Sequence, residues 1–282
     1  MLRACLRLYL LPCALLAPAY AQAQDGGALR ARHAALQQQL AGSPFGRPLH
    51  VESAVSGGTH KGDVHAVLDK PYAAVAAALA RPAHWCDILT LQINVKRCEA
   101  SNEALIAFIT KKPRDPVSSA HRIDFRFDVA AKRADYLQVA LNAPSGPMGT
   151  RDYEIRLEAA PLDAKRTFIH LSYGYTLGSM ARLAMDAYLV GPGRDKTGFS
   201  VVERRPDGSP VYVDGVRGVA ERSAMRYYLA IDASLEALAV PPAQRLDARL
   251  RRWYAEAARY PQLKEKVGAD EYVEMKRREA AS

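Results

Sequence analysis

The chain has 282 residues, of which 49% are hydrophobic and 24% charged, and its formal net charge at pH 7 is +9. A chain of this length and composition can bury a large core. Basic and acidic residues alternate along most segments, which excludes the charged stripe of a nucleic-acid-binding protein and leaves anionic membrane surfaces as candidate partners.

The first 23 residues have the pattern of a secretory signal peptide. Arg3 and Arg7 precede an apolar segment, Leu8–Leu16, and small residues suited to cleavage follow near Ala21. The segment is too short for a typical membrane anchor, although a retained N-terminal helix is the alternative. We therefore expect a periplasmic or secreted protein after cleavage.

Two cysteines, Cys86 and Cys98, remain beyond the predicted signal peptide. In an oxidising compartment two lone cysteines this close in sequence are expected to form a disulfide. A two-cysteine metal site would lack partner ligands nearby, and a redox pair usually has the CxxC spacing.

The N-terminal part of the chain alternates between helix and strand signals. Residues Ala28–Leu40 are helix-like, and Leu49–Ala54 and Asp63–Leu68 read as two strands joined by a Gly-Gly loop. Pro71 is placed to start a helix over Tyr72–Leu79, and a second short helix is predicted over His84–Leu89.

A long run of predicted strands follows. Their apolar and polar residues alternate, most cleanly in His121–Val129, which indicates an antiparallel sheet with one buried and one wet face. This parity puts carboxylates such as Asp124 and Glu158 on the wet face. The predicted strands are Leu91–Cys98, Leu105–Thr110, His121–Val129, Leu137–Leu141, Tyr153–Ala159 and Ile169–Tyr175.

The C-terminal part is mainly helical. A helix is predicted over Met180–Leu189, a hairpin over Phe199–Arg204 and Val211–Val216, and a long helix over Val219–Leu238. Residues 244–278 form a charged helical tail with a narrow apolar stripe. The tail is interpreted as packing on the domain surface, with a membrane-surface or partner-binding helix as the alternative.

The segment Val64–Leu89 resembles the opening of the START-like superfamily, which includes the Bet v 1-like proteins and polyketide cyclases. The similarity consists of an alternating strand, Pro71 at a helix start, Val75, Ala78-Leu79, and Trp85 in a second short helix. The resemblance implies an α+β helix-grip fold, a curved antiparallel sheet wrapped around a long C-terminal helix. The expected organisation is a signal peptide (1–23), an N-terminal helix (24–44), a START-like domain (45–240) and a helical tail (241–282).

The resemblance also implies a cavity between sheet and helix. Tyrosines suit a cavity for an amphipathic ligand, because each has an apolar body and a polar tip, but they serve equally as core residues. The candidate ligand-binding residues are aromatic and apolar side chains on the predicted inner faces: Trp85, Phe125, Phe127, Tyr153, Tyr173, Tyr175, Met225, Tyr228 and Leu229.

Catalytic, cofactor and metal signals are weak. There is no GxSxG motif, and the segment Gly191–Gly198 lacks the order of a phosphate loop. Asp63 and His65 share a strand face and read as a surface pair, and Arg222 and Arg226 as an internal salt-bridge network or an anion site. Glu221 and Asp232 are the best-placed acids on the long helix.

The leading hypothesis is a periplasmic protein that binds or carries a hydrophobic small molecule, such as a lipid, without catalysis, cofactor or metal. The first alternative is a cyclase- or hydrolase-like enzyme on the same fold. The second is an interaction protein whose cavity is closed. Fold alone does not decide among them.

Overall fold

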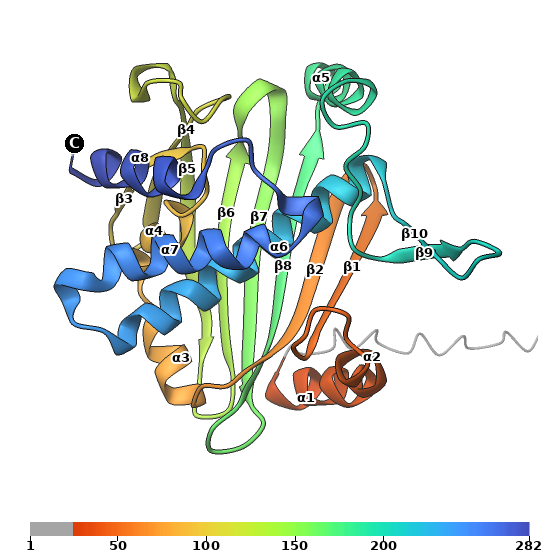
Figure 1. Cartoon of the computed structure of the whole chain (residues 1–282). Coiled ribbons are helices and arrows are strands. Elements are labelled where there is room, and N and C mark those ends of the chain that lie inside the picture. Colours follow the sequence, from red (N-terminus) through yellow and green to blue (C-terminus); the bar gives the residue numbers. More distant parts are fainter. Residues whose placement is uncertain (1–24, 282) are drawn as a thin grey trace, which may run out of the picture.

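The computed structural model describes residues 25–281, apart from the side chain of Met148, and is dominated by one antiparallel sheet (Figure 1). The predicted signal peptide lies outside the described residues. The strand order is β1-β2-β8-β7-β6-β5-β4-β3. The strands are β1 (Leu49–Ser56), β2 (Thr59–Leu68), β3 (Val95–Ala100), β4 (Ala104–Ile109), β5 (His121–Lys132), β6 (Leu137–Ser145), β7 (Thr150–Pro161) and β8 (Thr167–Leu177).

Helices and a small hairpin surround this sheet, and α6, α7 and α8 cross its inner face in Figure 1. The α-helices are α1 (Gly26–Ala35), α2 (Gln37–Ala41), α3 (Tyr72–Leu79), α4 (Pro82–Leu89), α5 (Ser179–Val190), α6 (Gly215–Glu236), α7 (Arg245–Ala258) and α8 (Ala269–Ala281). The hairpin strands are β9 (Val201–Arg204) and β10 (Pro210–Tyr212). Short 3-10 turns are η1 (Val117–Ser119), η2 (Pro147–Gly149), η3 (Ala237–Ala239), η4 (Pro242–Gln244) and η5 (Pro261–Leu263).

The core lies between the sheet and α6, as the residue alternation requires. On β5, Phe125 and Phe127 are buried while Asp124 is exposed. On α6, Met225 and Leu229 are fully buried against the sheet. A curved antiparallel sheet around a long C-terminal helix is the helix-grip fold, so the expected fold class is confirmed, and with it the architecture that the resemblance to the START-like superfamily implied.

The predicted disulfide is present. Cys86 on α4 is bonded to Cys98 on β3, with a Cα–Cα distance of 5.2 Å. The bond ties the helical pair α3–α4 to the edge strand of the sheet. Trp85 beside it is completely buried, and its indole Nε1 donates a hydrogen bond to the carbonyl of Leu79 at 2.7 Å.

The outer face of the sheet is not wet along its whole length, and this corrects the prediction for Glu158 and for the pair Asp63 and His65. Glu158 and Asp63 are each 7% exposed and His65 is 1% exposed. The reason is that α1 packs on β7 and β8 and covers this part of the outer face. The predicted helix Ala28–Leu40 is two helices, α1 and α2, with Leu36 between them.

Several element boundaries also differ from the prediction; for example, β2 begins at Thr59 and α6 at Gly215, each four residues earlier than expected. β3 begins at Val95, because the residues from Leu91 to Asn94 form turns, although Leu91 and Ile93 still join the core. The second hairpin strand ends at Tyr212, and Val216 belongs to the first turn of α6.

The charged tail packs into the main core. Trp253 on α7 and Tyr272 on α8 are fully buried and join the same cluster as the sheet residues. The Trp253 indole donates to the carbonyl of Arg226 at 3.2 Å, and the Tyr272 hydroxyl donates to the carbonyl of Leu91 at 2.7 Å. Among the described residues, no helix is both long and apolar enough to cross a membrane.

Candidate functional site

A pocket of about 400 Å³ opens between α6 and one end of the sheet. Its walls come from β4, β5, β7 and β8, from the α4–β3 connection, and from the segment between α7 and α8. The lining residues are Gln92, Ile93, Asn94, Val95, Ile109, Lys111, Pro113, Ile123, Phe125, Pro147, Tyr153, Tyr173, Ser223, Arg226, Tyr227 and Glu265.

Three tyrosines form one wall of this pocket. The ring of Tyr227 on α6 stacks on Tyr173 of β8, with 5.2 Å between centroids, and Tyr153 of β7 meets Tyr173 edge to face at 6.3 Å. The register of β7 against β8 shifts between Arg151 and Glu154, and Asp152 there has a φ of 53°. In the regular pairing of β7 with β6, Tyr153 has the same parity as the buried Ile155, so alternation along the strand puts it on the inner face with the pocket.

The hydroxyl groups of these tyrosines differ in their partners. The Tyr153 hydroxyl donates to the hydroxyl oxygen of Thr150 at 2.8 Å. The hydroxyls of Tyr173 and Tyr227 have no hydrogen-bond partner in the part of the chain that the structure describes. Burial raises the pKa of both phenols, so each keeps its proton at neutral pH and can donate it to a ligand.

The pocket also carries charge. Arg226 donates to one carboxylate oxygen of Glu265 through Nε at 3.1 Å and Nη2 at 2.9 Å, so these two charges compensate each other. Lys111 is exposed and forms no ion pair with any described residue. The pocket therefore combines apolar and polar walls with two phenol donors that no described residue engages and one ammonium group without an ion-pair partner among the described residues.

The nine residues expected to contact a ligand are distributed over three places. Phe125, Tyr153 and Tyr173 line the pocket. Tyr175 lies beside it in a small cluster with Leu177, and its buried hydroxyl has no partner. The others pack in the main core, away from the pocket lining: Trp85, Phe127, Met225, Tyr228 and Leu229.

The acids singled out on α6 have structural partners. Glu221 is fully buried and accepts hydrogen bonds from the backbone N–H groups of Phe199 and Ser200 at 2.6 and 2.9 Å. Asp232 pairs with Arg47 at 3.1 Å, and the same guanidinium donates to the Tyr228 hydroxyl at 3.1 Å. Neither carboxylate lines the pocket of about 400 Å³, which we call the tyrosine pocket.

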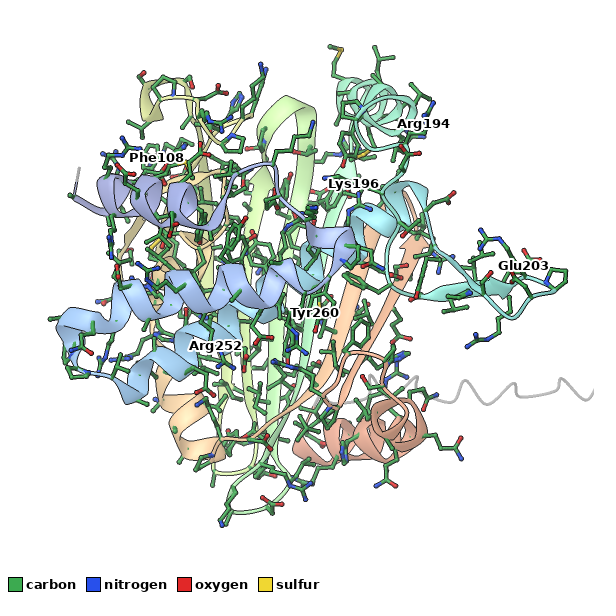
Figure 2. The ribbon with its side chains drawn as sticks, in the orientation of Figure 1. Phe108, Arg194, Lys196, Glu203, Arg252 and Tyr260 are labelled. Carbon is green, nitrogen blue, oxygen red and sulfur yellow. A yellow bond between two sulfur atoms is a disulfide. The ribbon has the colours of Figure 1, made fainter. Side chains whose placement is uncertain are left out.

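Arg222 and Arg226 contact different parts of the structure. Arg222 donates to the carbonyls of Lys196 and Thr197, both at 2.9 Å, and so holds the loop that follows α5. Figure 2 shows Arg194 and Lys196 on this loop, between α5 and the β9–β10 hairpin. Arg226 reaches the pocket instead. The two arginines therefore do not form a joint anion site.

A second group of ionisable residues lies on the outer face beneath α1. His170 is held between Asp63, at 2.8 Å from Nε2, and Glu158, at 2.9 Å from Nδ1, and its ring stacks on His65 at 4.4 Å. Burial opposes the charged imidazole, but the two carboxylates outweigh burial and raise the pKa of His170. Within residues 25–281 no group of three or more His, Cys, Asp or Glu side chains has the arrangement of a metal site.

Comparisons with known proteins give only weak likenesses. No family model and no curated protein matches the chain. Among solved structures, it is similar to a conserved protein from Geobacillus kaustophilus, at 12% identity and a TM-score of 0.37 over 62% of this chain and 95% of that one. It is similar to Ara h 8.0201, at 12% identity and 0.37 over 64% and 99%. It is also similar to norcoclaurine synthase from Thalictrum flavum, at 14% identity and 0.34 over 50% and 81%. These scores carry no argument about a ligand or reaction.

Sequence reasoning singled out Arg226 but missed two other charged residues of the pocket. Lys111 and Glu265 come from connecting segments that no periodic pattern marks, and Glu265 belongs to the tail rather than to the expected START-like domain. Tyr227 was visible as a tyrosine on the covering helix, but its neighbour Tyr228 fitted the apolar stripe better. The adjacent pair Tyr227 and Tyr228 was the sequence signal from which Tyr227 could have been identified as a pocket residue.

Proposed function

We propose that this protein binds and carries a small amphipathic molecule in the tyrosine pocket, with the apolar body of the ligand against the sheet and a polar or anionic group toward Lys111. The observation that carries the proposal is the pair of phenol hydroxyls, on Tyr173 and Tyr227, that no described residue engages, in a pocket that combines apolar and polar walls. Both tyrosines are half-buried, and an acceptor group of a ligand can form with either hydroxyl a hydrogen bond that no described residue supplies.

The volume narrows the class of ligand. Pockets for small organic molecules span about 300–1,000 Å³. At about 400 Å³ this pocket lies near the lower end of that range. The size favours a single ring system or a single-chain lipid over a ligand with two long chains.

The proposal is one of binding without catalysis. General acid–base catalysis needs a positioned group whose proton can move near neutral pH. The pocket phenols have raised pKa values, and the pocket carboxylate of Glu265 is engaged by Arg226. We place the protein in the periplasm or outside the cell, a location supported by the disulfide between Cys86 and Cys98, which suits an oxidising compartment.

Two neighbouring tyrosines on α6 supply a matched test. Tyr227→Phe removes a phenol donor from the pocket, whereas Tyr228→Phe removes a phenol that bonds to Arg47 in the core. The probe is 1-anilinonaphthalene-8-sulfonate, an aromatic anion whose fluorescence rises in apolar surroundings. We expect Tyr227→Phe to weaken probe binding about two- to tenfold, the value of one hydrogen bond, and Tyr228→Phe to leave it unchanged.

Lys111→Met tests the charged end of the pocket and should weaken binding of the sulfonate probe. Lys264→Met is the control, because it removes the same charge from an exposed position outside the pocket. Native mass spectrometry of protein exported to the periplasm of a bacterial host then identifies any natural ligand. Probe binding that is equal in the wild type, Tyr227→Phe and Lys111→Met would refute the proposed site.

A further inference from the structure

A separate pocket of about 250 Å³ lies where the helical tail meets the disulfide. It is bounded by α4, β3, α7 and α8, and so depends on both tail helices. The lining residues are Cys86, Asp87, Thr90, Lys96, Arg97, Cys98, Leu246, Arg249, Leu250, Lys276, Glu279 and Ala280.

Two buried lysines reach this pocket and share one carboxylate. The side chains of Lys96 and Lys276 are only 5% and 3% exposed. The ammonium group of Lys96 lies 2.7 Å from a carboxylate oxygen of Glu279, and that of Lys276 lies 2.9 Å from the other oxygen. No second carboxylate of the described residues pairs with either lysine. A buried charge without a counter-charge is costly.

Arg249 adds a third cation. Its Nη2 pairs with Asp87 at 2.7 Å. Arg97, the fourth basic residue of the lining, is paired with Glu99 at 3.1 Å and stacks on Phe108, which is labelled in Figure 2. Among residues 25–281, the three remaining cations therefore face two carboxylates, Glu279 and Asp87, which leaves one positive charge in excess within that part of the chain.

Two cationic N–H donors at this pocket also lack an acceptor. The Lys276 ammonium has three donors, but its acceptors among the described residues are two, the carbonyl of Val95 at 2.7 Å and Glu279. The Nε of Arg249 is buried and has no hydrogen-bond partner among those residues. The excess charge and the unused donors thus occur on the same side chains.

We propose that the pocket between β3 and the tail helices binds a small oxyanion, a phosphate or a group of the same shape and charge, held by Lys276 and Arg249 with Lys96 behind them. A single anion supplies the missing negative charge and an acceptor for the unused Lys276 donor, and charge-assisted hydrogen bonds are among the strongest that a protein forms. The source is either free phosphate or a lipid head group.

The protonation of Lys276 should be coupled to anion binding. Burial lowers the pKa of Lys276 to about 8, despite the nearby Glu279. A bound anion favours the charged lysine, so anion binding should raise this pKa and should weaken as the pH rises above it.

The test titrates the full mature chain with inorganic phosphate at neutral pH, against chloride of equal ionic strength, by calorimetry and by thermal unfolding. We expect phosphate to raise the melting temperature of the wild type. Lys276→Met should lower phosphate affinity about tenfold or more, as for a lost charged hydrogen bond. Lys266→Met is the control, because it removes an equal charge from an exposed position outside the pocket.

Arg249→Gln decides the question if Lys276→Met fails to fold, since Lys276 also supports the carbonyl of Val95. Vesicles of phosphatidylcholine with and without phosphatidylglycerol identify the source. Sedimentation of the wild type, but not of Arg249→Gln, with the anionic vesicles assigns the site to a head group, and phosphate binding alone assigns it to a free anion. Absence of phosphate and vesicle binding, or equal binding by the wild type and folded variants, would overturn the proposal.

Discussion

Replacing Cys86 and Cys98 together by serine removes the covalent tie between α4 and β3 while leaving the apolar surroundings of the bond in place. The two residues are 12 positions apart. For a closed loop of that size, the lost restriction on the unfolded chain corresponds to about 3 kcal/mol of folding free energy. The native contacts of Trp85 do not depend on the bond, so the cost should come mainly from the unfolded state.

The assay is urea unfolding followed by tryptophan fluorescence, which reports on the buried indoles of Trp85 and Trp253. The double variant and the reduced wild type should both unfold at lower urea than the oxidised wild type, by a free energy of about 3 kcal/mol. Mass analysis with and without reductant confirms the bond in the starting material. The reasoning fails if the oxidised wild type, the reduced wild type and the double variant share one unfolding midpoint.

Three further changes test the packing. Because its pKa is raised, His170 contributes stability that is present below about pH 6.5 and lost as the pH rises through the raised value. The stability deficit of His170→Gln, measured by chemical unfolding, should therefore shrink between about pH 6 and pH 9. A deficit that grows over this range would contradict the prediction. Trp253→Ala should cost about 3–5 kcal/mol in the same assay if the tail belongs to the core, and a cost near zero would show that it does not. Gly62→Ala places a Cβ against the carbonyl oxygen of Ala220 on α6 and should lower the free energy of unfolding by about 1–3 kcal/mol. Gly174→Ala is the control and should cost less, because the nearest neighbour of its Cβ is 3.6 Å away. Equal thermal stabilities of the two variants would refute the close contact.

Local patterns in the sequence determined the elements and their inner faces. The alternation along β5 identifies Phe125 and Phe127 as buried and Asp124 as exposed, because side chains on a strand point to opposite faces in turn. Pro71 marks the start of α3, since a missing N–H costs nothing at the start of a helix, whereas α4 begins at Pro82, two residues before the predicted His84. The presence of only Cys86 and Cys98 beyond the predicted signal peptide likewise predicted the disulfide between them.

Tertiary structure decided which inward residues meet a pocket and which outward residues are buried. Phe125 and Phe127 have the same parity, but only Phe125 lies near enough to the end of the sheet to line the pocket. Tyr227 and Tyr228 are adjacent, yet about 100° of helix rotation sends one to the pocket and the other to the core.

Contacts between segments far apart in the sequence decided the burial of Glu158 and the composition of the two pockets. Glu158 is buried because α1, more than 100 residues earlier, packs over its face of the sheet. The pocket acquires Glu265, and the proposed anion site acquires Lys276, only because α7 and α8 fold back onto α6 and β3. A periodic pattern records which side of an element is apolar, but the position of a distant segment depends on packing between elements, which no local spacing encodes.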